Sequence, residues 1–266
     1  MPIDPRRLAR GWAPALLAAA LAAGFGSAHA AEGAVSGAHW RDWQAHATAA
    51  DLPSLQRGAR DFVSYCLGCH SLRYERWSRL GRDLRIPKDV LIADLIPPGQ
   101  KPADYILSPM PRQDAVKWFG KAPPDLSLIA RYKGTNYLYR YLKTFYVDSG
   151  RATGANNLAY PNVAMPDVLS PLEGLKVAVY RTVNVQGAGG KVITRKVFAH
   201  FRQIAPGSLT PQQYDRFVRD TVNFLYYVSD PQRAERHRMG IWVILFLLAF
   251  TWLAWLLKRE YWKDVR

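Results

Sequence analysis

The longest apolar run of the chain lies near its C-terminus, from Ile241 to Leu257, and contains no charged residue. With Met239 and Gly240 it approaches the length that a helix needs to cross a bilayer core of about 30 Å at about 1.5 Å per residue. A helix buried in a soluble core is normally apolar on one side, whereas this segment is apolar on every side. The pattern predicts one transmembrane helix over residues 239–257, followed by a short tail over residues 258–266.

A second apolar run lies near the N-terminus, directly behind a cluster of arginines. Trp12–Phe25 is rich in alanine and leucine and is short for a spanning helix. Ala28-His29-Ala30 has the small-x-small form of a signal-peptidase site. We expect residues 1–30 to be a cleaved signal peptide, which would place residues 31–238 outside the cytoplasm. An uncleaved first anchor is the alternative.

Between these two runs the chain shows helical periodicity interrupted by loops. Ser54 follows a proline and is expected to cap the first helix at its N-terminus. That helix is predicted because apolar residues recur at steps of three and four: Leu55, Ala59, Phe62, Val63 and Cys66.

In the middle of the chain the sequence pattern predicts loops and two more helices. Residues 81–134 are rich in proline and favour loop with short helical turns. A helix is expected from Thr135 until Asp148-Ser149-Gly150, and another from Thr210-Pro211 until a break at Asp230-Pro231.

Two β-rich segments lie between those helices. Val177–Val183 and Val192–Phe198 flank a stretch of small residues over 187–190, which indicates a β-hairpin. The predicted fold class is therefore mainly α, with an inserted β-hairpin and one C-terminal transmembrane helix.

The stretch from Cys66 to His70 contains both cysteines of the chain in the order Cys-x-x-Cys-His. Thiols on one helical turn can each bond a vinyl group of haem, and the following histidine can reach the iron. A zinc site would need ligands that no other cysteine supplies, and a thioredoxin-type pair would not require His70. The motif predicts one covalent haem c, attached at Cys66 and Cys69 and ligated by His70.

An electron-transferring haem of this type commonly takes a thioether sulfur as its second axial ligand. Outside the signal and membrane segments the methionines are Met110 and Met165, each followed by proline. Met165 closes a polar, irregular stretch over residues 156–164 and is favoured, whereas Met110 could fill a gap in the core. His200 is the rival among the histidines.

The chain is strongly basic, with 36 Lys and Arg against 21 Asp and Glu and a net charge of +15. An exported domain meets no nucleic acid, and no long block of basic residues occurs. Membrane lipids with anionic headgroups, or an acidic protein, are the expected partners.

The haem motif alone fits any c-type cytochrome, but further segments of the chain are more specific. The segments are Leu55-Gln56-Arg57-Gly58, Cys66–His70, Trp118-Phe119-Gly120, Ala122–Ser127, Tyr160–Pro166, Val222–Leu225 and Arg238-Met239-Gly240. Together they resemble the cytochrome c1 family, the haem-bearing subunits of quinol–cytochrome c reductase (the cytochrome bc1 complex), in its bacterial type. The proline-rich and C-terminal segments make the resemblance specific.

The resemblance implies a class I cytochrome c-like haem domain and assigns roles within it. Cys66 and Cys69 would carry the thioethers, and His70 and Met165 would be the axial iron ligands. Arg131 and Tyr137 would lie near the haem propionates.

The resemblance also implies a one-electron relay rather than catalysis by this chain alone. Electrons would pass from a Rieske iron–sulfur protein to a cytochrome c acceptor, within a dimeric complex that also contains cytochrome b. The chain would be a single-pass protein of the bacterial inner membrane, with residues 31–238 periplasmic and residues 258–266 cytoplasmic. Because the chain is basic, we expect an acidic or neutral acceptor.

Two other functions fit the motif. One is a membrane-anchored cytochrome that serves a terminal oxidase or another dehydrogenase. The other is a haem enzyme or gas sensor with an open sixth iron position.

Overall fold

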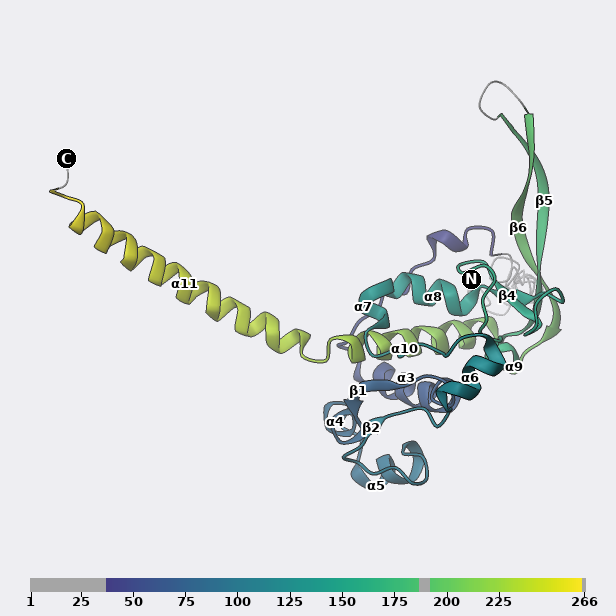
Figure 1. The fold of residues 1–266 in the computed structure, drawn as a ribbon, viewed down its shortest axis with the longest axis horizontal. Helices are drawn as coiled ribbons and strands as arrows, with labels where there is room; N and C mark the ends of the chain where they lie inside the picture. Colours follow the sequence, from purple (N-terminus) through teal and green to yellow (C-terminus); the bar gives the residue numbers. More distant parts are fainter. Residues whose placement is uncertain (1–36, 187–191, 265–266) are drawn as a thin grey trace, which may run out of the picture.

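The computed structural model describes residues 37–186 and 192–264. The expected signal peptide and the small residues at 187–190 lie outside these ranges. Within them the structure is mainly helical, with antiparallel strand pairs, and one long helix extends away from a folded body (Figure 1).

Helix α3 (Leu52–Tyr65) follows a short 3-10 turn, η2 (Trp40–Asp42), and delivers the cysteine motif. Its N-cap is Asp51, whose side chain accepts a hydrogen bond from the backbone N–H of Ser54 at 3.2 Å. The prediction that Ser54 caps the helix was therefore wrong. The cap lies further upstream because proline is tolerated in the first turn of a helix, and Pro53 occupies it.

The proline-rich middle forms short elements, as predicted, together with one small strand pair. β1 and β2 pair antiparallel, and the other elements are short helices of three to eight residues. The bounds are β1 (Leu72–Arg76), α4 (Trp77–Asp83), α5 (Lys88–Val90), the π-turn η3 (Leu91–Leu95), β2 (Tyr105–Ile106), α6 (Arg112–Phe119) and α7 (Ile129–Lys133).

Helix α8 (Thr135–Lys143) ends earlier than predicted. The amide of Asn157 donates to the carbonyl of Tyr141 at 2.7 Å and so satisfies a group that a longer helix would have used. The chain then forms β3 (Phe145–Val147), which pairs with β4 (Ala155–Asn157). The predicted stop at Asp148 is instead the start of the turn between these strands.

A long two-stranded ribbon comes next. After α9 (Ser170–Glu173), β5 (Gly174–Gln186) pairs antiparallel with β6 (Val192–Pro206). Both strands were predicted, but each is longer than its apolar pattern indicated.

Helix α10 (Pro211–Ser229) begins as predicted. Thr210 and Gln213 form a capping box, in which each side chain bonds the other's backbone N–H. The helix ends at Asp230, which confirms the expected break before the membrane segment.

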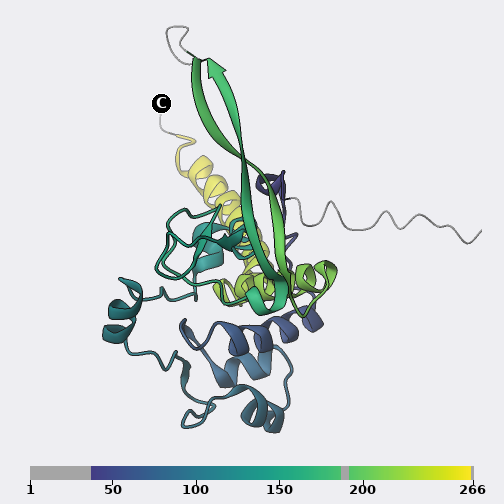
Figure 2. The ribbon, with the colours of Figure 1, turned by 90° about the vertical axis from the view of Figure 1, so that its right-hand side faces the viewer.

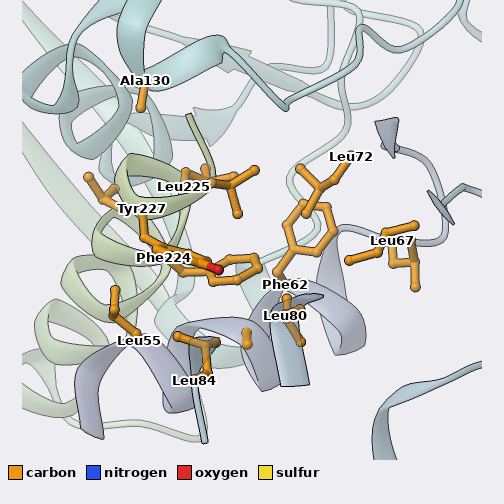
Figure 3. Close-up of a cluster of buried hydrophobic side chains, with 14 of the residues drawn as sticks. Leu55, Phe62, Leu67, Leu72, Leu80, Leu84, Ala130, Phe224, Leu225 and Tyr227 are labelled. Carbon is orange, nitrogen blue, oxygen red and sulfur yellow. The ribbon is translucent and has the colours of Figure 1, made fainter. Parts of the chain in front are cut away.

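Helix α10 is the centre of the folded body because it packs against both α3 and α8 (Figure 1). Apolar side chains from α3, α4 and α10 meet in one buried cluster, which includes Phe62, Leu80 and Phe224 (Figure 3). The rings of Phe62 and Phe224 lie 5.7 Å apart, centroid to centroid. This cluster fixes the end of α3, where the cysteine motif begins.

A buried polar network also joins α3 to α10. Asp220 accepts hydrogen bonds from the Ser54 hydroxyl at 2.5 Å and from Arg57 Nε at 2.6 Å. Asn223 donates to the Ser54 hydroxyl at 2.8 Å. The network satisfies polar groups that burial would otherwise penalise, so it fixes how the two helices are aligned.

Helix α11 (Arg233–Tyr261) extends far away from the folded body (Figures 1 and 2). Among the described residues, its segment Glu235–Tyr261 is the one helix long and apolar enough to cross a membrane, with a mean hydropathy of 2.3 over an apolar window of 18 residues. None of that apolar stretch is buried against the protein. The helix extends the predicted span, residues 239–257, at both ends.

The close approach of α3 and α10 at Gly58 yields a stability prediction. A Cβ at this position would lie 2.1 Å from the backbone carbonyl oxygen of Asp220. Gly58→Ala should therefore lower the free energy of unfolding of the haem-loaded chain by about 1–3 kcal/mol, measured by denaturant titration. Ser64→Ala, at an exposed position of the same helix, should change it by less than about 0.5 kcal/mol. Equal effects of the two substitutions would contradict this packing.

Candidate haem-attachment site

The turn from Cys66 to His70 continues directly from the last turn of α3. The backbone N–H of Cys66 donates to the carbonyl of Phe62 at 2.8 Å, and the N–H of His70 donates to the carbonyl of Cys66 at 2.8 Å. Both cysteines are free thiols and are half-buried. Burial raises the pKa of the Cys66 thiol to about 12, so it carries its proton at neutral pH. Both thiols and the imidazole therefore emerge from one hydrogen-bonded turn.

The imidazole of His70 is oriented by a backbone carbonyl. Its Nδ1 lies 2.8 Å from the carbonyl oxygen of Pro124, which can only accept a hydrogen bond. Nδ1 therefore carries the proton, and Nε2 has a free lone pair for a metal. Burial lowers the pKa of His70 and favours the neutral ring that metal ligation requires.

The segment that supplies this carbonyl is bound along the chain that follows His70. The N–H of Leu126 donates to the carbonyl of Ser71 at 2.9 Å, and Asp125 accepts from the N–H of Arg73 at 2.9 Å. The hydroxyl of Ser127 accepts from the N–H of Tyr74 at 3.2 Å. The Pro-Pro-Asp-Leu-Ser segment is thus a fixed support for the histidine.

Met110 belongs to a second segment that contacts the cysteine turn. The hydroxyl of Ser108 donates to the carbonyl of Gly68 at 2.9 Å and accepts from the N–H of Met110 at 3.1 Å. The N–H of Ser108 donates to the hydroxyl of Ser71 at 2.9 Å. Met110 itself is half-buried.

Met165 lies in a different cluster, beside α8 and β3. Its side chain is half-buried and packs with Phe145 and Val163. Its sulfur lies 3.3 Å from the hydroxyl of Tyr141, which is placed to donate to it. This contact between Tyr141 and Met165 was not predicted from the sequence.

Two asparagines hold the loop that leads to Met165. The side-chain oxygen of Asn156 accepts from the N–H of Asn162 at 2.8 Å, and that of Asn157 accepts from the N–H of Tyr160 at 3.0 Å. Asn162 adopts a left-handed backbone conformation with φ of 63°, which asparagine tolerates better than most residues. The loop is therefore irregular yet well braced.

Tyr137 and Arg131 lie in different surroundings. Tyr137 is half-buried and stacks on Tyr141, with ring centroids 6.1 Å apart. Arg131 is exposed. The cation placed over Tyr137 is Lys133, whose Nζ lies 5.6 Å from the ring centroid. Lys133 was not predicted from the sequence to lie near Tyr137, although it precedes Tyr137 by four residues, the spacing of neighbours on a helix.

Residues 121–124 contact both the Cys66–His70 turn and the loop before Met165. Pro124 contacts His70, and Lys121 lies over the ring of Tyr160 at 5.2 Å from its centroid. No hydrogen bond joins His70 directly to Met165 within residues 37–186 and 192–264. The rival ligand His200 is exposed on β6, where it pairs with Val179.

This set of donors fits a covalently attached haem c. It offers free thiols, a neutral imidazole with an available Nε2, and two half-buried thioethers, Met110 and Met165. Half-buried apolar side chains that pack on the core, among them Leu126, Ile129 and Tyr137, can line a porphyrin face. In the part of the chain that the structure describes, no cluster of three or more His, Cys, Asp or Glu could hold a metal ion, so a zinc site is not supported.

Comparison with known proteins identifies the family. A sequence profile of the Cytochrome C1 family matches residues 98–265. Cytochrome c1 of Allochromatium vinosum is 45% identical over 215 residues, which cover 81% of this chain and 86% of the relative. The chain belongs to the cytochrome c1 family. The resemblance inferred from the sequence is thereby confirmed, including its bacterial type.

Other relatives come from further bacteria and from a eukaryote. Cytochrome c1 of Rhodospirillum rubrum is 28% identical and covers 95% of this chain and 97% of the relative. The mitochondrial cytochrome c1 haem protein of Kluyveromyces lactis is 26% identical, over 81% of this chain and 72% of the relative. A protein of Nitrosomonas europaea named ammonia monooxygenase gamma subunit is 44% identical, over 81% of this chain and 85% of the relative.

This cytochrome c1 family member also contains a buried carboxyl group shortly after the Cys66–His70 turn. The side chain of Glu75, on β1, is only 1% exposed, and its nearest cation is Arg79 Nε at 3.8 Å. Burial raises the pKa of Glu75 to about 7 from 4.5, and the positive charge of Arg79 opposes part of that rise. Arg79 has a second carboxylate partner, Asp83, at 3.3 Å.

The raised pKa of Glu75 predicts a pH-dependent stability. The folded chain binds this proton more tightly than the unfolded chain, so stability should fall as pH rises from about 4.5 to about 7. Glu75→Gln should remove that loss and be more stable than the unmodified chain above neutral pH, by up to about 3 kcal/mol. Denaturant unfolding at several pH values measures this. Asp42→Asn, at an exposed carboxylate, should leave the pH profile unchanged, and an unchanged profile for Glu75→Gln would contradict the assignment.

Proposed function

We propose that this chain is the electron-transfer haem subunit of a quinol–cytochrome c reductase. It passes single electrons from a Rieske iron–sulfur protein to a cytochrome c acceptor and catalyses no reaction by itself. The observation that carries the proposal is the hydrogen-bonded Cys66–His70 turn, in a chain of the cytochrome c1 family whose histidine keeps Nε2 free.

The covalent attachment is assigned to Cys66 and Cys69 as thioethers to one haem c, with His70 as the first axial ligand. When bound, haem c supplies reversible one-electron chemistry. The role of the protein is to hold and orient: the α3 turn sets the spacing of the sulfurs, and Pro124 fixes the rotation of the imidazole.

Met165 is proposed as the second axial ligand. Its loop is braced by Asn156 and Asn157, and the hydroxyl of Tyr141 orients its sulfur. A braced loop that presents a half-buried thioether can hold its ligand without a large reorganisation between oxidation states. Met110, whose segment is hydrogen-bonded to the attachment turn itself, then has a packing role.

Arg131 and Tyr137 are proposed to lie near the haem propionates. The position of Lys133 over the ring of Tyr137 supports a cationic environment at this place. Tyr137 also stacks on Tyr141, which contacts the proposed ligand Met165.

The domain arrangement follows from the proposed function. Residues 31–238 form a periplasmic domain of class I cytochrome c type, with the β5–β6 ribbon as an insertion. Helix α11 anchors it in the bacterial inner membrane, and residues 258–266 are cytoplasmic. Its partners are cytochrome b, the Rieske subunit, membrane lipids and an acidic or neutral cytochrome c acceptor, in a dimeric complex without nucleic acid.

Substitution of the two methionines tests the ligand assignment. Met165→Leu should lose the low-spin ferrous spectrum and bind carbon monoxide, because the sixth position is left open. Met110→Leu, the matched control, should keep a spectrum that carbon monoxide does not change. The reverse pattern would assign the ligand to Met110.

Isolation from native membranes tests the proposed complex. In mild detergent the chain should copurify with a multi-span cytochrome b and a Rieske protein. Copurification with a terminal oxidase or with ammonia-oxidising subunits, and without cytochrome b, would contradict the proposal.

A further inference from the structure

The β5–β6 ribbon projects from the folded body as two strands, and within residues 37–186 and 192–264 no third strand and no helix covers its outer half (Figures 1 and 2). It leaves the body at the end opposite to the one from which α11 departs (Figure 1). An isolated two-stranded ribbon is at best marginally stable in water, so an exposed ribbon of this length is expected to have a partner.

The strand register sorts the outer half of the ribbon into two faces. Side chains alternate along a strand, and directly paired residues point to the same face. One set of pairs is Arg181 with Val197, Val183 with Arg195, and Val185 with Ile193. We call these six residues the valine–arginine face.

Four of the six side chains of the valine–arginine face are aliphatic, yet every residue of the face except the half-buried Val183 is exposed. Val185, Ile193 and Val197 are 38%, 50% and 40% exposed. Exposed aliphatic residues that share one face and are framed by charge are typical of an interaction site.

The two arginines of this face have no counter-charge among the described residues. Arg181 and Arg195 are diagonal neighbours across the ribbon, an arrangement in which like charges repel. Neither forms an ion pair with any residue in the described ranges of the chain. Residues 174–206 contain no aspartate or glutamate.

The opposite face of the ribbon is different. The rings of Tyr180 and Phe198 contact each other edge to face at 6.1 Å between centroids, and the Thr194 hydroxyl donates to Asn184 at 3.1 Å. Among the described residues of its outer half, Lys196 is the one cation, and it pairs with Thr182. This face is polar and partly satisfied by its own contacts.

We propose that the valine–arginine face is the docking surface of an acidic protein subunit that stays bound to this chain on the aqueous side of the membrane. Carboxylates of the partner would neutralise Arg181 and Arg195, and an apolar centre would cover the aliphatic side chains. A lipid surface fits poorly because the ribbon lies at the end away from α11. A second copy of this chain would bring a further excess of positive charge.

The aliphatic content favours a resident subunit over a transient redox partner. Brief electron-transfer contacts are small and wet, whereas lasting interfaces bury more apolar surface. This docking role goes beyond the proposed electron transfer and does not depend on which methionine binds iron.

Site-specific photo-crosslinking in native membranes tests the docking surface. The probe is benzoylphenylalanine, placed at Val185 on the valine–arginine face and at Asn184 on the opposite face of the full-length, haem-loaded chain. Val185 should crosslink to one acidic protein, and Asn184 should not. Arg195→Glu should weaken the Val185 crosslink about tenfold. Lys196→Glu makes the same charge change one residue away on the opposite face and should leave the crosslink intact.

Charge exchange separates specific docking from chance capture. Carboxylate-to-lysine substitution at the crosslinked site of the partner should restore the crosslink to the Arg195→Glu chain. A crosslink to a second copy of this chain, to lipid alone, or equally from both faces would overturn the proposal, as would failure of the charge exchange. The haem absorption spectrum of each variant shows whether the domain has folded around its haem. A lost crosslink with an unchanged spectrum therefore contradicts the docking proposal without contradicting the electron-transfer proposal.

Discussion

Helices α3 and α10 pass so close together that the backbone carbonyl of Asp220 occupies the space that a side chain at Gly58 would need. Glycine permits this approach, and the hydrogen bonds from Ser54 and Arg57 to Asp220 fix its alignment. The direction of α3 at its C-terminal end follows from this crossing. The attachment turn begins there, so the position of the cysteines and of His70 depends on a contact two helical turns away.

From that turn outward, backbone groups organise the site more than side chains do. The carbonyl of Pro124 selects the protonated nitrogen of His70, and the N–H of Leu126 ties the same segment to the chain after the histidine. On the other side, asparagine side chains substitute for backbone partners and brace the loop before Met165. Under the proposed function, such preformed supports would limit how far the proposed ligands move as the haem gains and loses electrons.

The features that sequence reasoning predicted correctly are those set by neighbouring residues. The capping box at Thr210 and Gln213, the break at Asp230 and the uninterrupted apolar run of α11 are all local signals. The family assignment rested on contiguous motifs and was likewise recoverable. The cap of α3 was misplaced by a few residues because Asp51 competes with Ser54 for the same role.

What could not be predicted depends on contacts between distant segments. The end of α8 is set by Asn157, which lies beyond the helix in a strand that the sequence pattern did not reveal. The two strands of the ribbon are longer than the segments of alternating apolar residues that predicted them, because strand pairing continues through polar residues. Sequence spacing likewise could not show that Lys133, rather than Arg131, lies over the ring of Tyr137. Nor could it show that the hydroxyl of Tyr141 contacts the sulfur of Met165.

In the proposed site, one imidazole and one thioether of this chain bind the haem iron from opposite sides. Iron-edge X-ray absorption of the haem-loaded chain, isolated from native membranes, detects both ligands. We expect a single sulfur neighbour beside the porphyrin and imidazole nitrogens, and loss of that sulfur in Met165→Leu. A coordination shell of nitrogens alone in the unmodified chain would contradict it.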